Sequence, residues 1–197
     1  SEMDKVINAK TDHLGASRDA TEYLISQGHQ HIAFLSTPFN RETRVKTLDG
    51  FRLALTSHNL PFSESDVMTV MYESEADDSL YELNAGRKLA DKFMDARKKK
   101  PYTAIVAIND LIAYGIIQRL LEQGIRIPED VSIISFDNIP YSALIHPPLT
   151  TMDMPARLLG QRACNLIVDS LGSNRDHNGI TLSVSAELVI RKSVRAL

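Results

Sequence analysis

The fold is decided by residues 103–138, which read TAIVAINDLIAYGIIQRLLEQGIRIPEDVSIISFDN. Two short apolar runs, 103–108 and 131–136, enclose a stretch in which apolar residues recur every three or four positions. Runs that are apolar at nearly every position are typical of strands buried on both faces, and the periodicity between them is typical of a helix packed on those strands. The stretch therefore predicts a strand, a helix and a second, parallel strand.

The same alternation continues on both sides of this unit. Two further strands are predicted at 31–36 and 67–72, helices at about 16–27, 44–58, 79–97, 110–124 and 156–171, and one or two strands within 180–191. Gly28, Gly124 and Gly172 follow the ends of predicted helices, where glycine favours termination. Strands that alternate with helices predict an α/β fold, a doubly wound and mostly parallel sheet with helices on both faces.

The composition is that of a globular protein. The chain has 197 residues, 43% hydrophobic and 24% charged, with a net charge of −3. This balance lacks the positive charge that binds DNA phosphates. No apolar run approaches the ~20 residues that cross a bilayer, and no signal peptide opens the sequence. We therefore expect a cytoplasmic protein that does not contact a membrane.

The motifs of common enzyme classes are missing from the sequence. It contains no GxxxxGK[ST], GxGxxG, GxSxG or HExxH, and its six histidines are not spaced as metal ligands. An enzyme that uses Asp110 or Asp137 as acid or base is an alternative, but neither has a recognisable nucleophile or metal beside it. We expect no cofactor, no metal and no catalysis.

Polar residues follow three of the predicted strands. Asn109 and Asp110 follow one, Asp137 and Asn138 follow another, and a polar loop at 37–44 follows a third. Asp110 could simply cap its helix and Asp137 could simply turn the chain. Two amide and carboxylate pairs at equivalent strand ends nevertheless indicate a shared site, because ligands of open α/β sheets bind there. These groups suit a ligand rich in hydroxyls.

Residues 101–163 resemble the effector-binding domain of LacI/GalR-type transcriptional regulators. The shared features are ND followed by A and G, then GIRIPEDVS, FDN and PPLTT, in that order. The flanks 12–36 and 188–194, which read DHLGASRDATEYLISQGHQHIAFLS and LVIRKSV, agree. The resemblance covers nearly the whole chain. It implies a periplasmic-binding-protein-like domain that binds a small, sugar-like effector between two α/β lobes.

The resemblance also implies how the chain is organised. Residues 1–197 would be a partial effector-binding domain, in which 13–152 and 185–197 form the C-terminal lobe and 153–184 are a return segment of the N-terminal lobe. The DNA-binding headpiece that contacts the operator would lie outside the chain. A sugar receptor of a transport system shares this fold and is the alternative function.

Three effector-binding residues follow from the same alignment. Asp137 matches the family's effector-binding aspartate, and Asn109 matches a polar residue that faces the same cleft. Tyr81 falls where family members place a stacking aromatic ring. These positions imply that effector binding changes the orientation of the lobes and so the affinity for DNA.

One departure from the family concerns its ligand-binding arginine, three residues before a GF pair. The GF pair here begins at Gly50, and the matching position is Thr47. Lys46, Arg44 or Arg41 could supply the missing cation. A hydroxyl does not replace a planar guanidinium, so the effector could differ from a plain sugar.

The loop 139–149 is expected to pair two copies of the chain. It carries Tyr141, Leu144 and Ile145, an apolar cluster beside the edge of the sheet. Such a cluster suits a symmetric homodimer interface.

Overall fold

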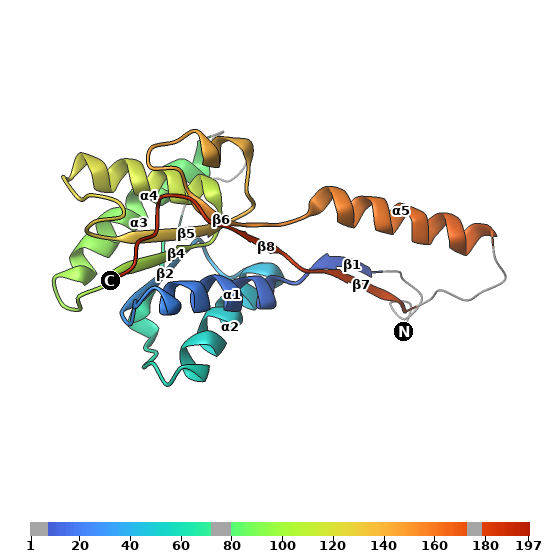
Figure 1. The fold of residues 1–197 in the computed structure, drawn as a ribbon, viewed down its shortest axis with the longest axis horizontal. Coiled ribbons are helices and arrows are strands. Elements are labelled where there is room, and N and C mark those ends of the chain that lie inside the picture. Colours follow the sequence, from blue (N-terminus) through green and yellow to red (C-terminus); the bar gives the residue numbers. More distant parts are fainter. Residues whose placement is uncertain (1–7, 72–79, 173–178) are drawn as a thin grey trace.

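The computed structural model describes residues 8–71, 80–172 and 179–197 (Figure 1). Its strands are β1 Asn8–Thr11, β2 Ile32–Ser36, β3 Val67–Thr69, β4 Ala104–Ala107, β5 Ser132–Phe136, β6 Thr150–Asp153, β7 Thr181–Val184 and β8 Glu187–Val189. Its helices are α1 His13–Ser26, α2 Glu42–Ser57, α3 Tyr81–Arg97, α4 Asp110–Glu122 and α5 Ala156–Gly172, with short 3-10 helices η2 Glu64–Asp66 and η3 Pro140–Ala143.

The main body is built around one six-stranded sheet of order β3-β2-β4-β5-β6-β8. Every neighbouring pair is parallel except β6 and β8, which run antiparallel. Helices α1 and α2 cover one face and α3 and α4 cover the other (Figure 1). The predicted doubly wound, mostly parallel α/β architecture is therefore confirmed.

Each face of the sheet has its own apolar layer, and β4 contributes to both. Ala104 and Val106 pack with α1, α2 and Phe51, whereas Ile105 and Ala107 pack with α3, α4 and Phe93. All four β4 residues are fully buried. This is why the central strands are apolar at nearly every position instead of alternating.

Three elements project from the body on the side where the parallel strands end (Figure 1). The strands β1 and β7 form a two-stranded parallel sheet, with Asn8 opposite Thr181 and Thr11 opposite Val184. Helix α5 lies along them, and none of its side chains from 156 to 170 is buried. None of the described helices is long and apolar enough to cross a membrane.

The structure departs from the sequence-based expectation in a few places. The strands β6, Thr150–Asp153, and β1, Asn8–Thr11, were not expected from the sequence. Both are short and polar, so their residues lack the apolar run that signals a buried strand. The strand expected at 67–72 ends at Thr69. Residue 72 and the expected helix start at 79 lie outside the described residues.

Candidate functional site

The strand order of the main sheet reverses between β2 and β4. After β2 the chain turns outward to β3, and the next strand, β4, lies on the opposite side of β2. In doubly wound sheets such a reversal leaves a crevice at the carboxyl ends of the two strands, where ligands bind. Thr37 directly follows β2, Asn109 lies just beyond β4, and Asp137 directly follows the adjacent β5. The fold thus brings together the three polar strand ends that the sequence singled out.

The loop that carries Asp137 has an uncommon backbone conformation. Asp137 has a φ of 107° and Asn138 a φ of 53°, in the region that side chains other than glycine seldom adopt. The amide of Asp137 donates to the carbonyl of Met152 at 2.9 Å, and Nη2 of Arg191 donates to Oδ1 of Asn138 at 2.6 Å. These bonds hold the turn that directs Asp137 out of the sheet. The residue as a whole is exposed, although the surrounding protein withdraws its carboxylate partly from water.

Asp110 is not the helix cap that the sequence suggested. It is fully buried, and Asn109 caps α4 instead, because Oδ1 of Asn109 accepts from the amide of Ile112 at 2.9 Å. Oδ1 of Asp110 accepts from Ser135 Oγ at 2.5 Å and from Thr151 Oγ1 at 2.7 Å.

The second carboxylate oxygen of Asp110 anchors the segment that follows Asp137. Oδ2 accepts from the amide of Ile139 at 2.9 Å and from the hydroxyl of Ser142. Ser142 is in turn 2.8 Å from the hydroxyl of Tyr114. Because all four bonds are internal, Asp110 supports the Asp137 loop from below and is not placed as a ligand contact.

Asp137 lies in negatively charged surroundings. Withdrawal from water by the surrounding protein, together with the charges of Asp110 and Glu82, raises the pKa of Asp137 to about 6. Glu82 is held at the site by Asn109, whose Nδ2 donates to Glu82 Oε1 at 2.6 Å. Asn109 therefore links α3 to α4 as well as capping α4.

Tyr81 begins α3, next to Glu82, and is 8% exposed. The bond between the neighbouring Glu82 and Asn109 places Tyr81 near the carboxyl end of β4, but the residue is largely covered. A stacking role would need this ring to become more accessible. Tyr81 belongs to the candidate site by position, and its stacking role is implied by the resemblance alone.

The candidates on α2 have different environments. Thr47 is 3% exposed, and its hydroxyl donates to the carbonyl of Thr43 at 2.8 Å. Arg44 is 8% exposed and donates to the carbonyl of Pro38 at 3.1 Å and to Oδ1 of Asn40 at 3.0 Å. Arg44 thus holds the loop between β2 and α2. Lys46 is exposed and free of these internal bonds.

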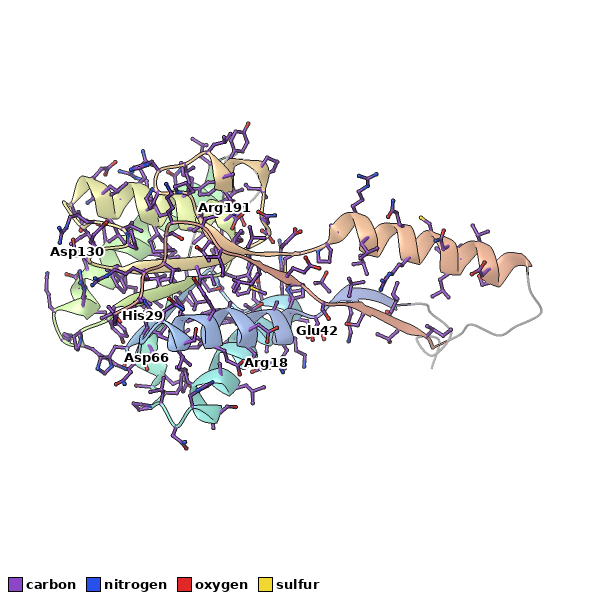
Figure 2. The ribbon with its side chains drawn as sticks, viewed as in Figure 1. Arg18, His29, Glu42, Asp66, Asp130 and Arg191 are labelled. Atoms are coloured by element: carbon purple, nitrogen blue, oxygen red, sulfur yellow. The ribbon has the colours of Figure 1, made fainter. Side chains whose placement is uncertain are left out.

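Lys46 lines a separate cavity of about 380 Å³ between the body and the projecting elements. Its other walls include Lys10, Asp12 and Glu42, and Figure 2 shows Glu42 where the projection leaves the body. Neither Asp137 nor Asn109 lines this cavity. The structure therefore divides the predicted effector-binding residues into one group around the ends of β4 and β5 and another on the first turns of α2.

The residues expected at a dimer interface differ in exposure. Tyr141 is 65% exposed and Leu144 is 78% exposed, both at η3 or directly after it. Ile145 is only partly exposed, because it packs against the core layer formed with α3 and α4. Tyr141 and Leu144 therefore form the accessible part of the cluster.

Two residues of the site were missed from the sequence. Glu82 faces the site through its bond to Asn109, and Arg191 holds Asn138. Their only sequence signals were position: Glu82 adjoins Tyr81, and Arg191 lies within the LVIRKSV motif. Within residues 8–71, 80–172 and 179–197, no three His, Cys, Asp or Glu side chains are grouped to hold a metal ion.

A doubly wound sheet with polar side chains at its reversal point is typical of a small-molecule-binding α/β domain. Residues 21–194 match the periplasmic binding protein-like domain family, and the chain belongs to it. The resemblance to the effector-binding domain of LacI/GalR-type regulators is thereby confirmed, as the similar proteins also show.

Two curated relatives are transcriptional repressors. The chain is 34% identical to the HTH-type transcriptional repressor PurR of Vibrio parahaemolyticus over 178 residues, 90% of this chain and 50% of the relative. The PurR of Histophilus somni is also 34% identical, with the same coverage. The chain thus spans about half the length of these relatives. They are repressors and not enzymes or transport receptors.

Solved structures of similar regulators show the same fold. A LacI family regulator from Enterococcus faecium with bound ribose is 27% identical, with a TM-score of 0.80 over 96% of this chain and 66% of that one. A sugar-binding LacI family regulator from Escherichia coli, complexed with phosphate, is 26% identical, with a TM-score of 0.82 over 98% of this chain and 68% of that one.

Proposed function

We propose that this chain senses a small polar effector for a LacI-type transcriptional regulator, and that the effector binds at Asp137. The observation that carries the proposal is the placement of Asp137 beside Asn109 at the carboxyl ends of adjacent strands, next to the reversal of the sheet. Similar regulators in complex with cellobiose and with ribose support a sugar-like ligand.

The proposed regulatory mechanism is a change in the relative orientation of two lobes. In this proposal, 13–152 and 185–197 form one lobe, 153–184 belong to the other, and the effector touches both. Binding then favours one lobe orientation, and it can do so only to the extent that the two orientations differ in affinity for the effector. The orientation would change how a DNA-binding headpiece outside this sequence meets its operator in the cytoplasm.

Homodimerisation belongs to the same proposal. Two copies would pair through Tyr141 and Leu144, with Ile145 supporting them from the core. A symmetric pair of headpieces matches the two-fold symmetry of a typical operator.

The effector site can be tested with isotope-labelled protein by nuclear magnetic resonance. Sugars, nucleosides and nucleobases are titrated at millimolar concentration, because the method detects weak complexes. We expect at least one ligand class to shift the backbone amides around Asn109 and Asp137 in a saturable manner. Asp137→Ala should abolish these shifts, because it removes the carboxylate that accepts hydrogen bonds from the ligand.

Asp95→Asn serves as the matched control, since Asp95 is an exposed carboxylate near the other end of α3 that pairs with Lys98 at 2.7 Å. It should leave the shifts intact. Saturable binding that persists in Asp137→Ala, or that maps away from the ends of β4 and β5, contradicts the proposal.

A further inference from the structure

One short segment connects the candidate site to the surface proposed for dimerisation. Asp137 lies at its start, and the exposed side chains of Tyr141 and Leu144 lie in η3 and directly after it. Within the segment, the amide of Ser142 donates to the carbonyl of Ile139 at 2.9 Å. A displacement of η3 therefore acts on the turn that carries Asp137 across only a few residues.

The buried carboxylate of Asp110 ties this segment to the main sheet. Its Oδ2 accepts from the amide of Ile139 at 2.9 Å and from the hydroxyl of Ser142. Its Oδ1 accepts from Ser135 in β5 at 2.5 Å and from Thr151 in β6 at 2.7 Å. Because breaking these bonds leaves polar groups unpaired in the interior, the segment and Asp110 hold each other in place.

The turn at Asp137 needs such support. Asp137 has a φ of 107° and Asn138 a φ of 53°, and residues with side chains persist in this region only where the surrounding structure fixes them. Arg191 fixes Asn138 from one side, and Asp110 holds the next residue, Ile139, from the other. The conformation of Asp137 therefore depends on the position of Ile139.

The outer side of η3 has little support within one copy of the chain. Tyr141 is 65% exposed and Leu144 is 78% exposed, whereas Ser142 is the one residue of η3 that is buried. Segments with few buried apolar contacts open locally at a low cost in free energy. The hydroxyl of Ser142, which reaches Asp110 and lies 2.8 Å from the hydroxyl of Tyr114, is thus the inward anchor of η3.

A recess lies beside the protruding side chain of Leu144. Ile145, which directly follows Leu144, lines a hollow of about 300 Å³ together with Leu83 and Tyr114. A two-fold interface needs a protrusion and a recess on one face, because each copy contributes the same surface. The face around η3 has both, so it suits a second copy of this chain, and Tyr114 connects the recess to Ser142.

We propose that pairing of two copies orders the effector site. The partner covers Tyr141 and Leu144 and fixes η3, Ser142 transmits this to Asp110, and Asp110 acts as a positioning residue for the turn that presents Asp137. This inference rests on the proposed function, since it links the proposed effector site to the proposed dimer interface. A ligand that requires the ordered turn then binds the dimer more tightly, and by linkage it strengthens the dimer by the same factor.

Hydrogen–deuterium exchange tests the inference without a ligand. The amide of Ile139 reports the state of the turn, because it exchanges with solvent when its bond to Asp110 opens. Exchange is followed by mass spectrometry in short peptides of the wild-type protein, over concentrations that span the dissociation constant of the dimer measured by sedimentation. We expect the exchange rate of Ile139 to fall about threefold or more from monomer to dimer.

The amide of Ser63 is the matched control. It also donates to a buried carboxylate, Oδ2 of Asp66 at 2.9 Å, but it lies before η2, next to β3 at the far side of the sheet. Its exchange rate should not depend on protein concentration. The double alanine variant of Tyr141 and Leu144 should exchange at Ile139 as the diluted wild type does.

Two further variants separate transmission through Ser142 from simple shielding by the partner. Ser142→Ala removes the connection to Asp110 but keeps Tyr141 and Leu144, so the dimer should still form while the exchange of Ile139 no longer depends on concentration. Thr151→Val removes a hydroxyl from the same carboxylate on the β6 side and should retain the dependence. Direct shielding of the amide by the partner would persist in Ser142→Ala.

The outcomes distinguish this inference from the proposed function. If the wild type stays monomeric at every concentration, the proposed homodimer fails and this inference fails with it. If the dimer forms but the exchange of Ile139 is unchanged, or responds equally in Ser142→Ala, the proposed function stands and ordering of the site by pairing is ruled out. The titration with sugars, nucleosides and nucleobases tests the effector site separately.

Discussion

At the scale of single residues, two neighbouring aspartates have opposite roles. Asp110 is fully buried and accepts four hydrogen bonds, so its charge is stabilised and it holds the chain. Asp137 projects at the surface, with Glu82 and Asp110 as its charged neighbours. The same residue type thus supports the fold at one position and is left available for a ligand at the other.

The unfavourable charge of Asp137 predicts a pH-dependent gain in stability for Asp137→Asn. The pKa of Asp137 in the folded state, about 6, lies above the ordinary aspartate value of 3.8. Between these pH values the folded state holds more protons than the unfolded state, so the free energy of unfolding falls as the pH rises through this window. Asp137→Asn removes this loss of unfolding free energy, because an asparagine side chain does not ionise. Its melting temperature should exceed that of the wild type near pH 7, and the difference should shrink near pH 4.

Thermal unfolding followed by circular dichroism at several pH values checks this. Asparagine also tolerates positive φ well, but that contribution is independent of pH. A difference in melting temperature that is the same near pH 4 and near pH 7 would contradict the raised pKa.

At the scale of elements, the contact between α3 and α4 brings two backbones together. A Cβ atom on Gly115 would lie 2.0 Å from the carbonyl oxygen of Leu83, and one on Gly86 would lie 2.2 Å from the carbonyl oxygen of Ile112. Both obstacles are backbone atoms, which cannot move aside as a side chain can. This close contact positions Glu82 on α3 against Asn109 at the start of α4.

Gly115→Ala should therefore destabilise the protein despite the higher helix propensity of alanine. Forcing the helices apart should lower the free energy of unfolding by about 1–3 kcal/mol. Gly160→Ala is the matched control, since Gly160 lies in α5 with no atom within 4 Å of an added Cβ. It should raise stability by roughly 0.5–1 kcal/mol. Urea unfolding measures both, and a neutral or stabilising Gly115→Ala would refute the close contact.

At the scale of the whole molecule, two of the regions with exposed apolar side chains are candidates for contact with other surfaces. Tyr141 and Leu144 lie at η3, and Leu158, Ile167 and Val168 lie on the projecting α5. Apolar groups gathered at the surface indicate contact with another protein surface. The first region is the one proposed to pair two copies of the chain.

Replacing Tyr141 and Leu144 together by alanine should shift the protein from dimer to monomer. The two side chains are the most exposed of the cluster, and their apolar area would be buried by pairing. Analytical ultracentrifugation over a range of concentrations gives the measurement. Alanine at Val45 and Leu53, 40% and 42% exposed on α2, should leave the dimer unchanged. A dimer that survives the Tyr141 and Leu144 replacements places the interface elsewhere.

Much of the architecture could be predicted from the sequence because its signals are local. The strands β2, β4 and β5 appear as apolar runs, and α1 to α5 as three-to-four-residue periodicity. The polar pairs that begin at Asn109 and Asp137 could be placed at strand ends from these signals alone. Strands β1 and β6 could not be found in this way, since each is a four-residue segment without an apolar run.

The amino-acid sequence by itself determined the order of the helices and of the apolar strands, the family and the polar residues at the strand ends. Only the tertiary structure decided which of these residues is available to a ligand. The carboxylate of Asp110 accepts hydrogen bonds from residues 25 to 41 positions away along the chain. The carboxylate of Glu82 accepts one from Asn109, 27 positions away. Periodicity depends on neighbours along the chain, whereas the environment of a carboxylate depends on segments that folding brings together.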